Sequence, residues 1–321
     1  MNPESLCIAL CQMAPVWLNK KATTDKIISY MEEASAKGAE LAVFGEALLP
    51  GYPFWVELTD GARFNSEVQK ELYAHYVREA VNIEGGDLAS ICEAAKKLKL
   101  AVYLGTIERG KNRGNHSVYC SLVYIDQQGE IQSVHRKLMP TYEERLVWAQ
   151  GDGKGLVVHP LKDFTLGGLN CWENWLPMPR ASLYAQGENV HIAVWPGNVR
   201  NTVDITRFIA MESRSYVISV CGLMGKAHIP DDIPQADLIK KHAPTWMGNG
   251  GSCLAAPDGS WMIEPVPEKE GVFTGVIHME NVLRERQNLD VSGHYSRPDV
   301  LQLQVNRGRQ QVAHFTDEAE D

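Results

Sequence analysis

The sequence predicts an α/β fold in which helices and mixed β-sheets are layered, and two observations support this prediction. Short apolar, β-prone runs alternate with amphipathic stretches along the chain, which is the usual pattern of layered α/β proteins. The turn sequences Asp126-Gln-Gln-Gly129 and Pro257-Asp-Gly259 join strands as hairpins, so some neighbouring strands must run antiparallel. A chain of 321 residues could hold one large domain or two ordinary ones. Because no linker interrupts the pattern, we expect one domain over residues 1–300 and a polar, poorly ordered tail over 301–321.

In the first half of the chain, apolar runs predict strands and periodic apolar positions predict helices. Strands are expected at Leu6–Met13, Leu41–Phe44, Leu100–Ile107, Val118–Ile125 and Ile131–Lys137. A helix is expected at Thr23–Lys37, where Ile27, Ile28 and Met31 share one face and Gly38 follows as a stop. A second helix is expected at Asp87–Leu98.

The second half repeats this alternation. Strands are expected at Phe164–Asn170, Val190–Trp195, Tyr216–Leu223, Ser252–Ala256, Ser260–Glu264 and Val272–His278. Helical sequence is expected around Ala181–Gln186, Asp204–Ser215 and Met279–Gln287.

The bulk composition narrows the class of function. The net charge of −9 argues against a nucleic-acid or anionic-membrane partner, because both need clustered positive charge. No apolar run reaches the roughly 20 residues of a transmembrane helix, and the N-terminus does not resemble a signal peptide. The seven cysteines show no CxxC spacing, so we expect free thiols and a cytoplasmic location. Six of the seven are expected to be small buried hydrophobes.

Cys171 is the exception, because its position predicts a reactive thiol. An apolar run ends in Gly167 and Gly168, the cysteine follows, and a helix-like stretch comes after it. We expect a sharp turn at the end of a strand, with a helix N-terminus close enough to favour the thiolate. Glu46 and Lys137 also stand at or just past strand ends, so one sheet edge could bring all three together.

Two kinds of chemistry could activate such a thiol. A histidine is the usual base, and His135, His159, His191 and His294 lie near the informative segments, although core or edge packing is expected for His135 and His191. Alternatively, a buried glutamate with a raised pKa can take the thiol proton, while a lysine stabilises negative charge on the substrate. Considered alone, Glu46 or Lys137 would be interpreted as an ordinary surface charge or ion pair. Considered together with Cys171, they favour activation of the thiol by a glutamate and a lysine.

Three segments resemble the motifs of the nitrilase superfamily of carbon–nitrogen hydrolases, and of its nitrilase branch in particular. These are Phe44-Gly-Glu-Ala-Leu-Leu-Pro-Gly-Tyr-Pro, His135-Arg-Lys-Leu-Met-Pro-Thr-Tyr-Glu-Glu-Arg-Leu-Val-Trp and Gly168-Leu-Asn-Cys-Trp-Glu-Asn. Further similarity occurs at Val194-Trp-Pro-Gly, Gly250-Gly-Ser and Gly293-His-Tyr-Ser-Arg-Pro-Asp. The resemblance covers about residues 6–300 in the family's order.

The resemblance implies roles for individual residues. Glu46 would be the general base, Lys137 the charge stabiliser, Cys171 the nucleophile and Glu144 the second glutamate that orients the others. Trp172, directly after the cysteine, is similar to nitrilases rather than to aliphatic amidases or carbamoylases. The implied fold is a four-layer α-β-β-α sandwich that dimerises into an α-β-β-α–α-β-β-α assembly, and such dimers can stack into spirals.

The implied activity is hydrolysis of an organic nitrile through a thioimidate and a thioester on Cys171, without metal or organic cofactor. Aromatic side chains suit the wall of a pocket for a small, mostly apolar nitrile. The expected wall residues are Tyr52, Trp172, Trp195 and Pro196, with Phe54, Trp55, His191 and Asn198 as weaker candidates. Cyanide hydratase or dihydratase, amidase, a Cys–His thiol hydrolase and an inactive interaction protein are the alternatives. An inactive interaction protein would be expected to lack Glu46, Lys137 or Cys171, and all three are present.

Overall fold

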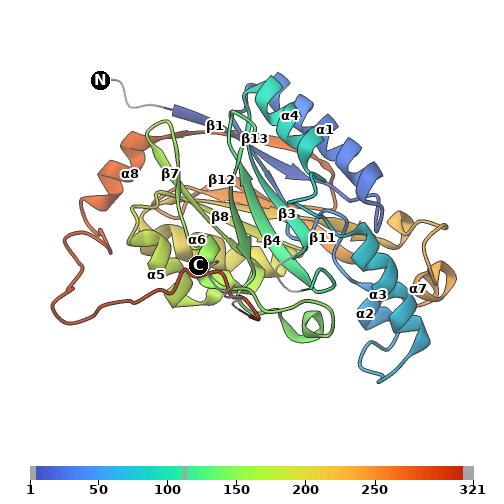
Figure 1. Cartoon of the computed structure of the whole chain (residues 1–321). Coiled ribbons are helices and arrows are strands. Elements are labelled where there is room, and N and C mark those ends of the chain that lie inside the picture. The colour runs from blue at the N-terminus through green and yellow to red at the C-terminus, as the bar shows by residue number, and fades with distance from the viewer. Residues whose placement is uncertain (1–4, 111–113, 314–321) are drawn as a thin grey trace, which may run out of the picture.

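The computed structural model describes residues 5–110 and 114–313, and its strands form two mixed sheets packed face to face (Figure 1). The expectation that the N-terminus is not a signal peptide concerns a segment whose first four residues lie outside the described range. So does the acidic end of the expected tail at residues 317–321.

The first sheet has the strand order β13-β1-β2-β3-β4-β5. Its centre is parallel, because β1 pairs with β2 and β2 with β3 in the same direction, whereas β13, β4 and β5 are added antiparallel. The strands are β1 Ser5–Gln12, β2 Leu41–Phe44, β3 Ala101–Arg109, β4 Val118–Ile125, β5 Ile131–Arg136 and β13 Gly271–His278.

The second sheet has the order β10-β11-β9-β8-β7-β6, and β12 pairs with β11. Again the centre is parallel, through β7, β8 and β9, and hairpin partners complete the edges. The strands are β6 His159–Leu161, β7 Phe164–Asn170, β8 Val190–Trp195, β9 Tyr216–Cys221, β10 Leu223–Gly225, β11 Trp246–Ala255 and β12 Trp261–Pro267. Both sheets are therefore mixed, as the hairpin turns predicted.

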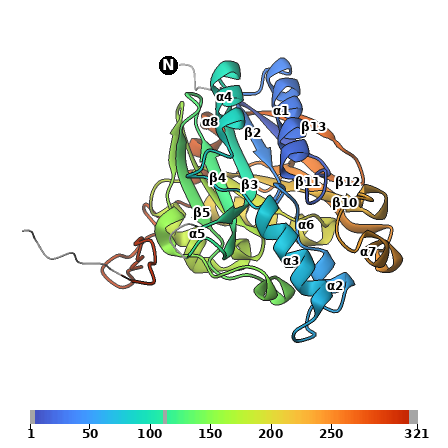
Figure 2. The ribbon, with the colours of Figure 1, turned by 45° about the vertical axis from the view of Figure 1, so that its right-hand side comes forward.

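Helices cover the outer faces of the two sheets (Figures 1 and 2). α1 Lys20–Ala36 and α4 Ala89–Leu98 pack on the first sheet, and α5 Pro177–Tyr184 and α6 Val199–Ser213 lie on the second. The remaining helices are α2 Trp55–Leu58, α3 Glu67–Glu79, α7 Ala236–His242 and α8 Met279–Arg286. The result is the expected α-β-β-α sandwich. Among the described residues, no helix combines the length and hydrophobicity needed to cross a bilayer.

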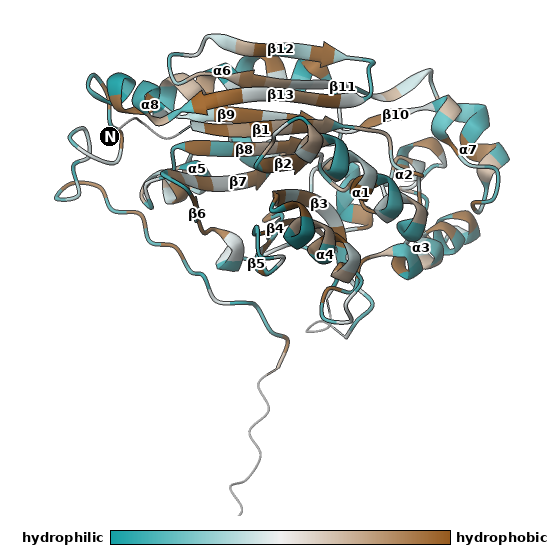
Figure 3. Cartoon of the chain, turned by 90° about the horizontal axis from the view of Figure 1, so that it is seen from above, coloured by the Kyte–Doolittle hydropathy of each residue, from teal (hydrophilic) through white to brown (hydrophobic). Residues whose placement is uncertain are grey.

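Strand alternation divides the apolar core into layers. On β8, Ile192 and Val194 face the first sheet, while Ala193 and Trp195 face the helical layer of α6. Figure 3 shows the central strands largely hydrophobic and the outer helices mixed, with hydrophilic outer faces. This alternation matters for the site, because it decides which side chains can reach the catalytic residues.

Helix starts differ most from the sequence expectations. α1 begins at Lys20 rather than Thr23, because the side chain of Asn19 accepts a hydrogen bond from the backbone N–H of Ala22. α6 begins at Val199 rather than Asp204, with Asn198 as its cap. The elements α2, α3, α7 and β6 were not predicted at all. The expected strand Tyr216–Leu223 is broken at Gly222 into β9 and β10.

The described part of the tail has no helix or strand from residue 301 to 313, but it contacts the body of the protein. Arg309 forms an ion pair of 2.9 Å with the buried carboxylate of Asp152 and donates to the backbone carbonyl of Val134. The backbone N–H of Gln310 also donates to Asp152. The tail therefore follows the edge of the first sheet beside β5.

Candidate active site

The structure brings Glu46, Lys137, Glu144 and Cys171 together in one buried cluster. Glu46 follows β2, Lys137 directly follows β5, and Cys171 directly follows β7, so three strand ends converge as the sequence suggested. The Nζ atom of Lys137 lies 2.9 Å from Glu46 Oε1 and 2.7 Å from Glu144 Oε2. One carboxylate oxygen of each glutamate and the Cys171 sulfur all lie within 4.8 Å of one another.

Close backbone packing places Glu46. A Cβ atom on the preceding Gly45 would lie 2.6 Å from the backbone nitrogen of Gly222, so only glycine fits there. The backbone N–H of Glu46 donates to the carbonyl of Trp195 at 3.2 Å, which ties the turn after β2 to the end of β8. The Glu46 side chain is completely buried. Among the described residues, its Oε2 atom has no hydrogen-bond partner and is free to accept a proton.

Lys137 is fixed by backbone hydrogen bonds through both its N–H and its carbonyl. Its N–H donates to the carbonyl of Cys120 at 2.8 Å, and its own carbonyl accepts from Gly151 at 2.8 Å. The side chain, 1% exposed, therefore extends into the cluster between Glu46 and Glu144.

Glu144 is held by a short 3-10 helix, η2 Tyr142–Leu146. Its Oε2 atom accepts from the backbone N–H of Thr141 at 2.6 Å, and its Oε1 atom accepts from the hydroxyl of Tyr52 at 2.9 Å. The carboxylate thus has two neutral donors besides Lys137.

Cys171 opens a second 3-10 helix, η4 Cys171–Trp175, and has a left-handed backbone with φ of 48°. Such a conformation is costly for a residue other than glycine and persists only where the surroundings enforce it. Here the side-chain amide of Asn174 donates to the carbonyl of Cys171 at 2.8 Å. The predicted sharp turn after the strand is present, and the thiol is only 3% exposed.

The electrostatics differ from the sequence expectation that the turn would favour the thiolate. Burial raises the pKa of the Cys171 thiol well above its ordinary value, with Glu46 adding to this and Lys137 opposing it. Burial likewise raises the pKa of Glu46 to about 7, although Lys137 lowers it. Burial alone would lower the pKa of Lys137, but Glu46, Cys171 and Glu144 outweigh it and raise that pKa well above its usual range. The arrangement is therefore a neutral thiol, a carboxylate base poised near neutrality and a permanent ammonium.

Glu46, Glu144 and Cys171 could in principle offer three ligands to a metal ion. However, the ammonium of Lys137 lies within 3 Å of both carboxylates, at the position where a cation would be held. A divalent ion there would have to displace a charge that already neutralises the pair. The group is better suited to acid–base chemistry than to metal binding.

The expected wall residues fall into two groups. Tyr52, Phe54 and Pro196 line a cavity of about 10 Å³ beside Glu46, which is room for about one water molecule. Trp172 lies on the outer side, 54% exposed, in an apolar surface pocket of about 500 Å³ that also includes Thr141.

Trp195 was expected in the wall, but the structure places its indole in the core. Strand alternation points it towards α6, where it packs with Ile205 and donates to the hydroxyl of Ser219 at 3.2 Å. It lies in the same apolar cluster as Cys171. Asn198 caps α6, as described above.

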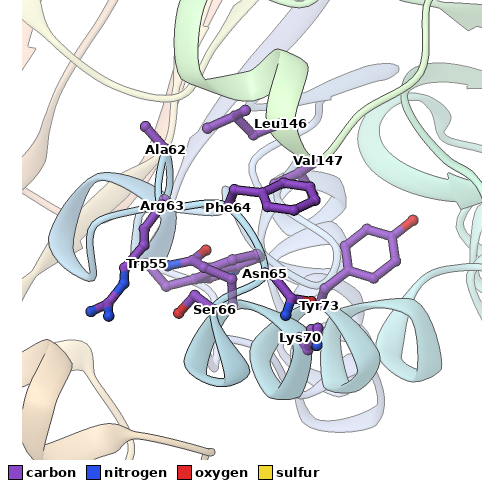
Figure 4. A pocket seen from close by; sticks show the side chains of 12 residues that line it. Trp55, Ala62, Arg63, Phe64, Asn65, Ser66, Lys70, Tyr73, Leu146 and Val147 are labelled. Carbon is purple, nitrogen blue, oxygen red and sulfur yellow. The ribbon is translucent and has the colours of Figure 1, made fainter.

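Trp55 lines a different pocket, shown in Figure 4, with a volume of about 440 Å³. Its walls come from α2, α3 and the loop between them, including Phe64 and Tyr73, together with Leu146 and Val147. None of the four clustered residues lines it.

No histidine among the described residues is hydrogen-bonded to Cys171, which removes the geometric basis for a Cys–His pair. His135 and His191 are buried, as expected, but each is part of a polar network. His135 pairs with Glu173 at 3.0 Å, and His191 contacts the Asn174 side chain at 2.7 Å.

Three supporting residues were missed by sequence reasoning. Cys120 was read as an apolar filler, yet its thiol donates to Glu46 Oε1 at 3.5 Å. Glu173 and Asn174 were quoted only as parts of a motif, although both hold the Cys171 turn. Polar residues directly after a nucleophile, in an otherwise apolar segment, were the available signal for the last two.

Comparisons with known proteins agree with this geometry. A model of the carbon-nitrogen hydrolase family matches residues 7–286. The chain is 35% identical over 312 residues to Nitrilase 2 from an unknown prokaryotic organism, covering 97% of this chain and 95% of that protein. It is 32% identical to the aliphatic nitrilase of Rhodococcus rhodochrous, covering 95% and 82%, and 32% identical to an arylacetonitrilase of Aspergillus niger, covering 94% and 92%.

Solved structures show the same fold at lower sequence identity. A carbon-nitrogen hydrolase from Helicobacter pylori G27 superimposes with a TM-score of 0.69 at 18% identity, covering 92% of this chain and 97% of that one. The C. elegans NitFhit protein gives a TM-score of 0.71 at 16% identity, covering 97% and 70%.

Proposed function

Because the chain belongs to the carbon-nitrogen hydrolase family, we propose that its buried cluster hydrolyses organic nitriles to carboxylic acids and ammonia. One observation supports this most strongly. A thiol and two carboxylates lie within 4.8 Å of one another around a shared ammonium, and among the described residues one oxygen of the base, Glu46 Oε2, has no hydrogen-bond partner. The relatives that align over nearly the whole chain include nitrilases and an arylacetonitrilase, which favours nitriles over the amide and cyanide alternatives.

The first half of the reaction forms the covalent bond. The Cys171 thiol, whose pKa is raised by burial, passes its proton to Glu46 as the sulfur attacks the nitrile carbon. One π bond of the nitrile breaks, and its electron pair moves to the nitrogen, which takes the proton to give a thioimidate. The Lys137 ammonium stabilises the charge that develops on this nitrogen.

The second half releases the products. A water molecule, deprotonated by Glu46, adds to the thioimidate carbon and gives a tetrahedral intermediate. That intermediate expels ammonia and leaves a thioester on Cys171. A second water hydrolyses the thioester, so two waters are consumed for each acid and ammonia released. Glu144 keeps Lys137 between the two carboxylates throughout, and Tyr52 holds Glu144.

Tyr52, Phe54 and Pro196 are proposed to line the site beside Glu46, and Trp172 to border it from the outer pocket. Residues 1–300 are proposed to act as one domain. A homodimer is proposed as the working unit, supported by exposed apolar side chains around the outer pocket. These are Met139, Tyr142, Trp172, Trp175, Leu176 and Met178. Because all seven cysteines are free, a reducing compartment such as the cytoplasm suits the protein.

Ammonia release tests the proposal directly. The purified protein is given an aromatic, an arylacetic and an aliphatic nitrile, cyanide and the matching amides, with Cys171→Ala as the blank. Release from at least one organic nitrile, absent in the blank, is the expected result. Release from amides or cyanide alone would assign a sibling activity instead, and equal release by the blank would remove Cys171 from the mechanism.

A further inference from the structure

Glu173 lies two residues after the nucleophile, and its carboxylate joins two catalytic segments that come from different sheets. Its Oε2 atom accepts the backbone N–H of Asn170, the residue before Cys171, at 2.8 Å. Its Oε1 atom accepts the backbone N–H of Leu138, the residue after Lys137, at 2.6 Å. One side chain therefore binds the chain next to the nucleophile and the chain next to the lysine at the same time.

His135 completes this arrangement from β5, two residues before Lys137. Its Nε2 atom lies 3.2 Å and 3.0 Å from the two oxygens of Glu173, so the ring must donate from Nε2. Both side chains are almost completely buried, at 3% and 2% exposure. Among the described residues, Nδ1 of His135 has no partner, so the only polar contacts of the ring are with Glu173.

The carboxylate is suited to stay ionised. Burial alone would raise the pKa of Glu173, but His135 and the two backbone N–H groups outweigh burial and hold it below its ordinary value. Because the pKa of Glu173 is lower in the folded protein, the stability that its ionised carboxylate contributes is present above about pH 4.5 and is lost only at lower pH. Both oxygens therefore act as acceptors throughout the neutral range.

We propose that Glu173, oriented by His135, is a positioning residue that sets the separation of Cys171 from Lys137. Neither side chain touches the reacting atoms. The need for such a residue follows from the geometry, because Cys171 has a strained backbone and Lys137 belongs to the opposite sheet. Small errors in the placement of reacting groups cost about 10²-fold in rate, so a tie between the two segments matters for turnover.

Glu173→Gln tests the proposal with almost no change of shape. One acceptor oxygen becomes an NH₂ group, which must face a backbone N–H or the ring N–H. We expect kcat to fall about 100-fold, with KM changed less than about threefold. Glu173→Asp keeps the charge but is too short to reach both N–H groups, so a similar loss is expected. It serves as the second test if the glutamine variant does not fold.

His135 variants separate positioning from general stability. His135→Gln retains an N–H donor for Glu173 and should stay within about threefold of wild-type kcat, whereas His135→Leu should lose at least about tenfold. Asp87→Asn is the matched control, because Asp87 also accepts a backbone N–H and pairs with a cation, Lys20, far from the cluster. It should lower the melting temperature without changing kcat.

The kcat measurements above rest on the proposed nitrile hydrolysis. A second measurement needs no nitrile and is therefore independent of that proposed function. The rate of Cys171 alkylation by iodoacetamide is measured against pH. Its midpoint should move by at least about half a pH unit in Glu173→Asp, which keeps the carboxylate charge, and stay unchanged in Asp87→Asn, because the distances of Cys171 from Lys137 and Glu46 change only in the former. Wild-type kcat in folded Glu173→Gln together with an unshifted midpoint in folded Glu173→Asp would overturn the proposal. A shifted midpoint in a protein that hydrolyses no nitrile would support it while refuting the proposed activity.

Discussion

Replacing Glu46 by Gln should make the folded protein more stable at alkaline pH while abolishing turnover. The pKa of Glu46 is raised from 4.5 to about 7 in the folded protein, mainly by burial. A raised pKa means that the folded state holds this proton more tightly than the unfolded state. The corresponding stability is fully present below about pH 4.5 and is lost as the pH rises through about 7.

The size of the effect follows from the shift. Each pKa unit corresponds to 1.36 kcal/mol, so keeping Glu46 ionised in its buried position costs about 3 kcal/mol above pH 8. Glutamine resembles the protonated carboxyl and avoids this cost at every pH. The stability difference between Glu46→Gln and wild type should therefore be close to zero at about pH 4.5 and reach about 3 kcal/mol at about pH 8.5.

Urea denaturation at about pH 5 and about pH 8.5 measures this difference. Glu67→Gln is the control, because it makes the same chemical change at an exposed carboxylate on α3, outside the buried cluster. A Glu46→Gln protein that is less stable than wild type at alkaline pH would refute the reasoning, as would a difference that does not change with pH. Either result would mean that the Lys137 ammonium stabilises the Glu46 anion at least as much as burial destabilises it.

Three further predictions concern the same cluster. The kcat/KM should fall below about pH 7 as Glu46 takes up a proton and ceases to be a base, which a pH–rate profile measures; a flat kcat/KM profile between pH 6 and 8 would contradict the assigned base. Lys137→Met should lower kcat by about 10³-fold and destabilise the fold by about 3–5 kcal/mol at alkaline pH, because two buried carboxylates lose their counter-ion. An unchanged midpoint of urea denaturation would contradict this prediction. Tyr52→Phe should lower kcat about tenfold by removing a donor to Glu144, and wild-type kcat would show that Glu144 needs no such support.

The strands were predicted well because burial on both faces leaves a nearly continuous apolar run, as at Leu41–Phe44. The N-terminal part of β11 was missed because it is rich in glycine, which disfavours strands in isolation. Tertiary packing explains the glycines: a Cβ atom on Gly251 would lie 2.8 Å from the backbone of Val199. Short helices such as α2 were missed because four residues give too little periodicity.

Glu46, Lys137 and Cys171 could be predicted because each follows a strand and belongs to a recognisable segment, whereas Glu144 could be predicted from its segment alone. The side of the strand on which a residue lies could not be deduced, which explains why Trp195 was expected in the wall rather than in the core. The supporting residues could not be found for a related reason. Cys120 reaches Glu46 from another strand of the same sheet, and Glu173 reaches the residue after Lys137 from the other sheet; only the folded structure specifies these contacts.

The central claim is that Cys171 becomes covalently bonded to the nitrile carbon during turnover. The direct measurement is peptide mass spectrometry of protein quenched in acid while it hydrolyses a nitrile identified by ammonia release. The account predicts a thioimidate or thioester mass increment confined to the peptide that carries Cys171, and no turnover or increment in Cys171→Ala. An increment on another residue, or continued turnover by Cys171→Ala, would contradict it.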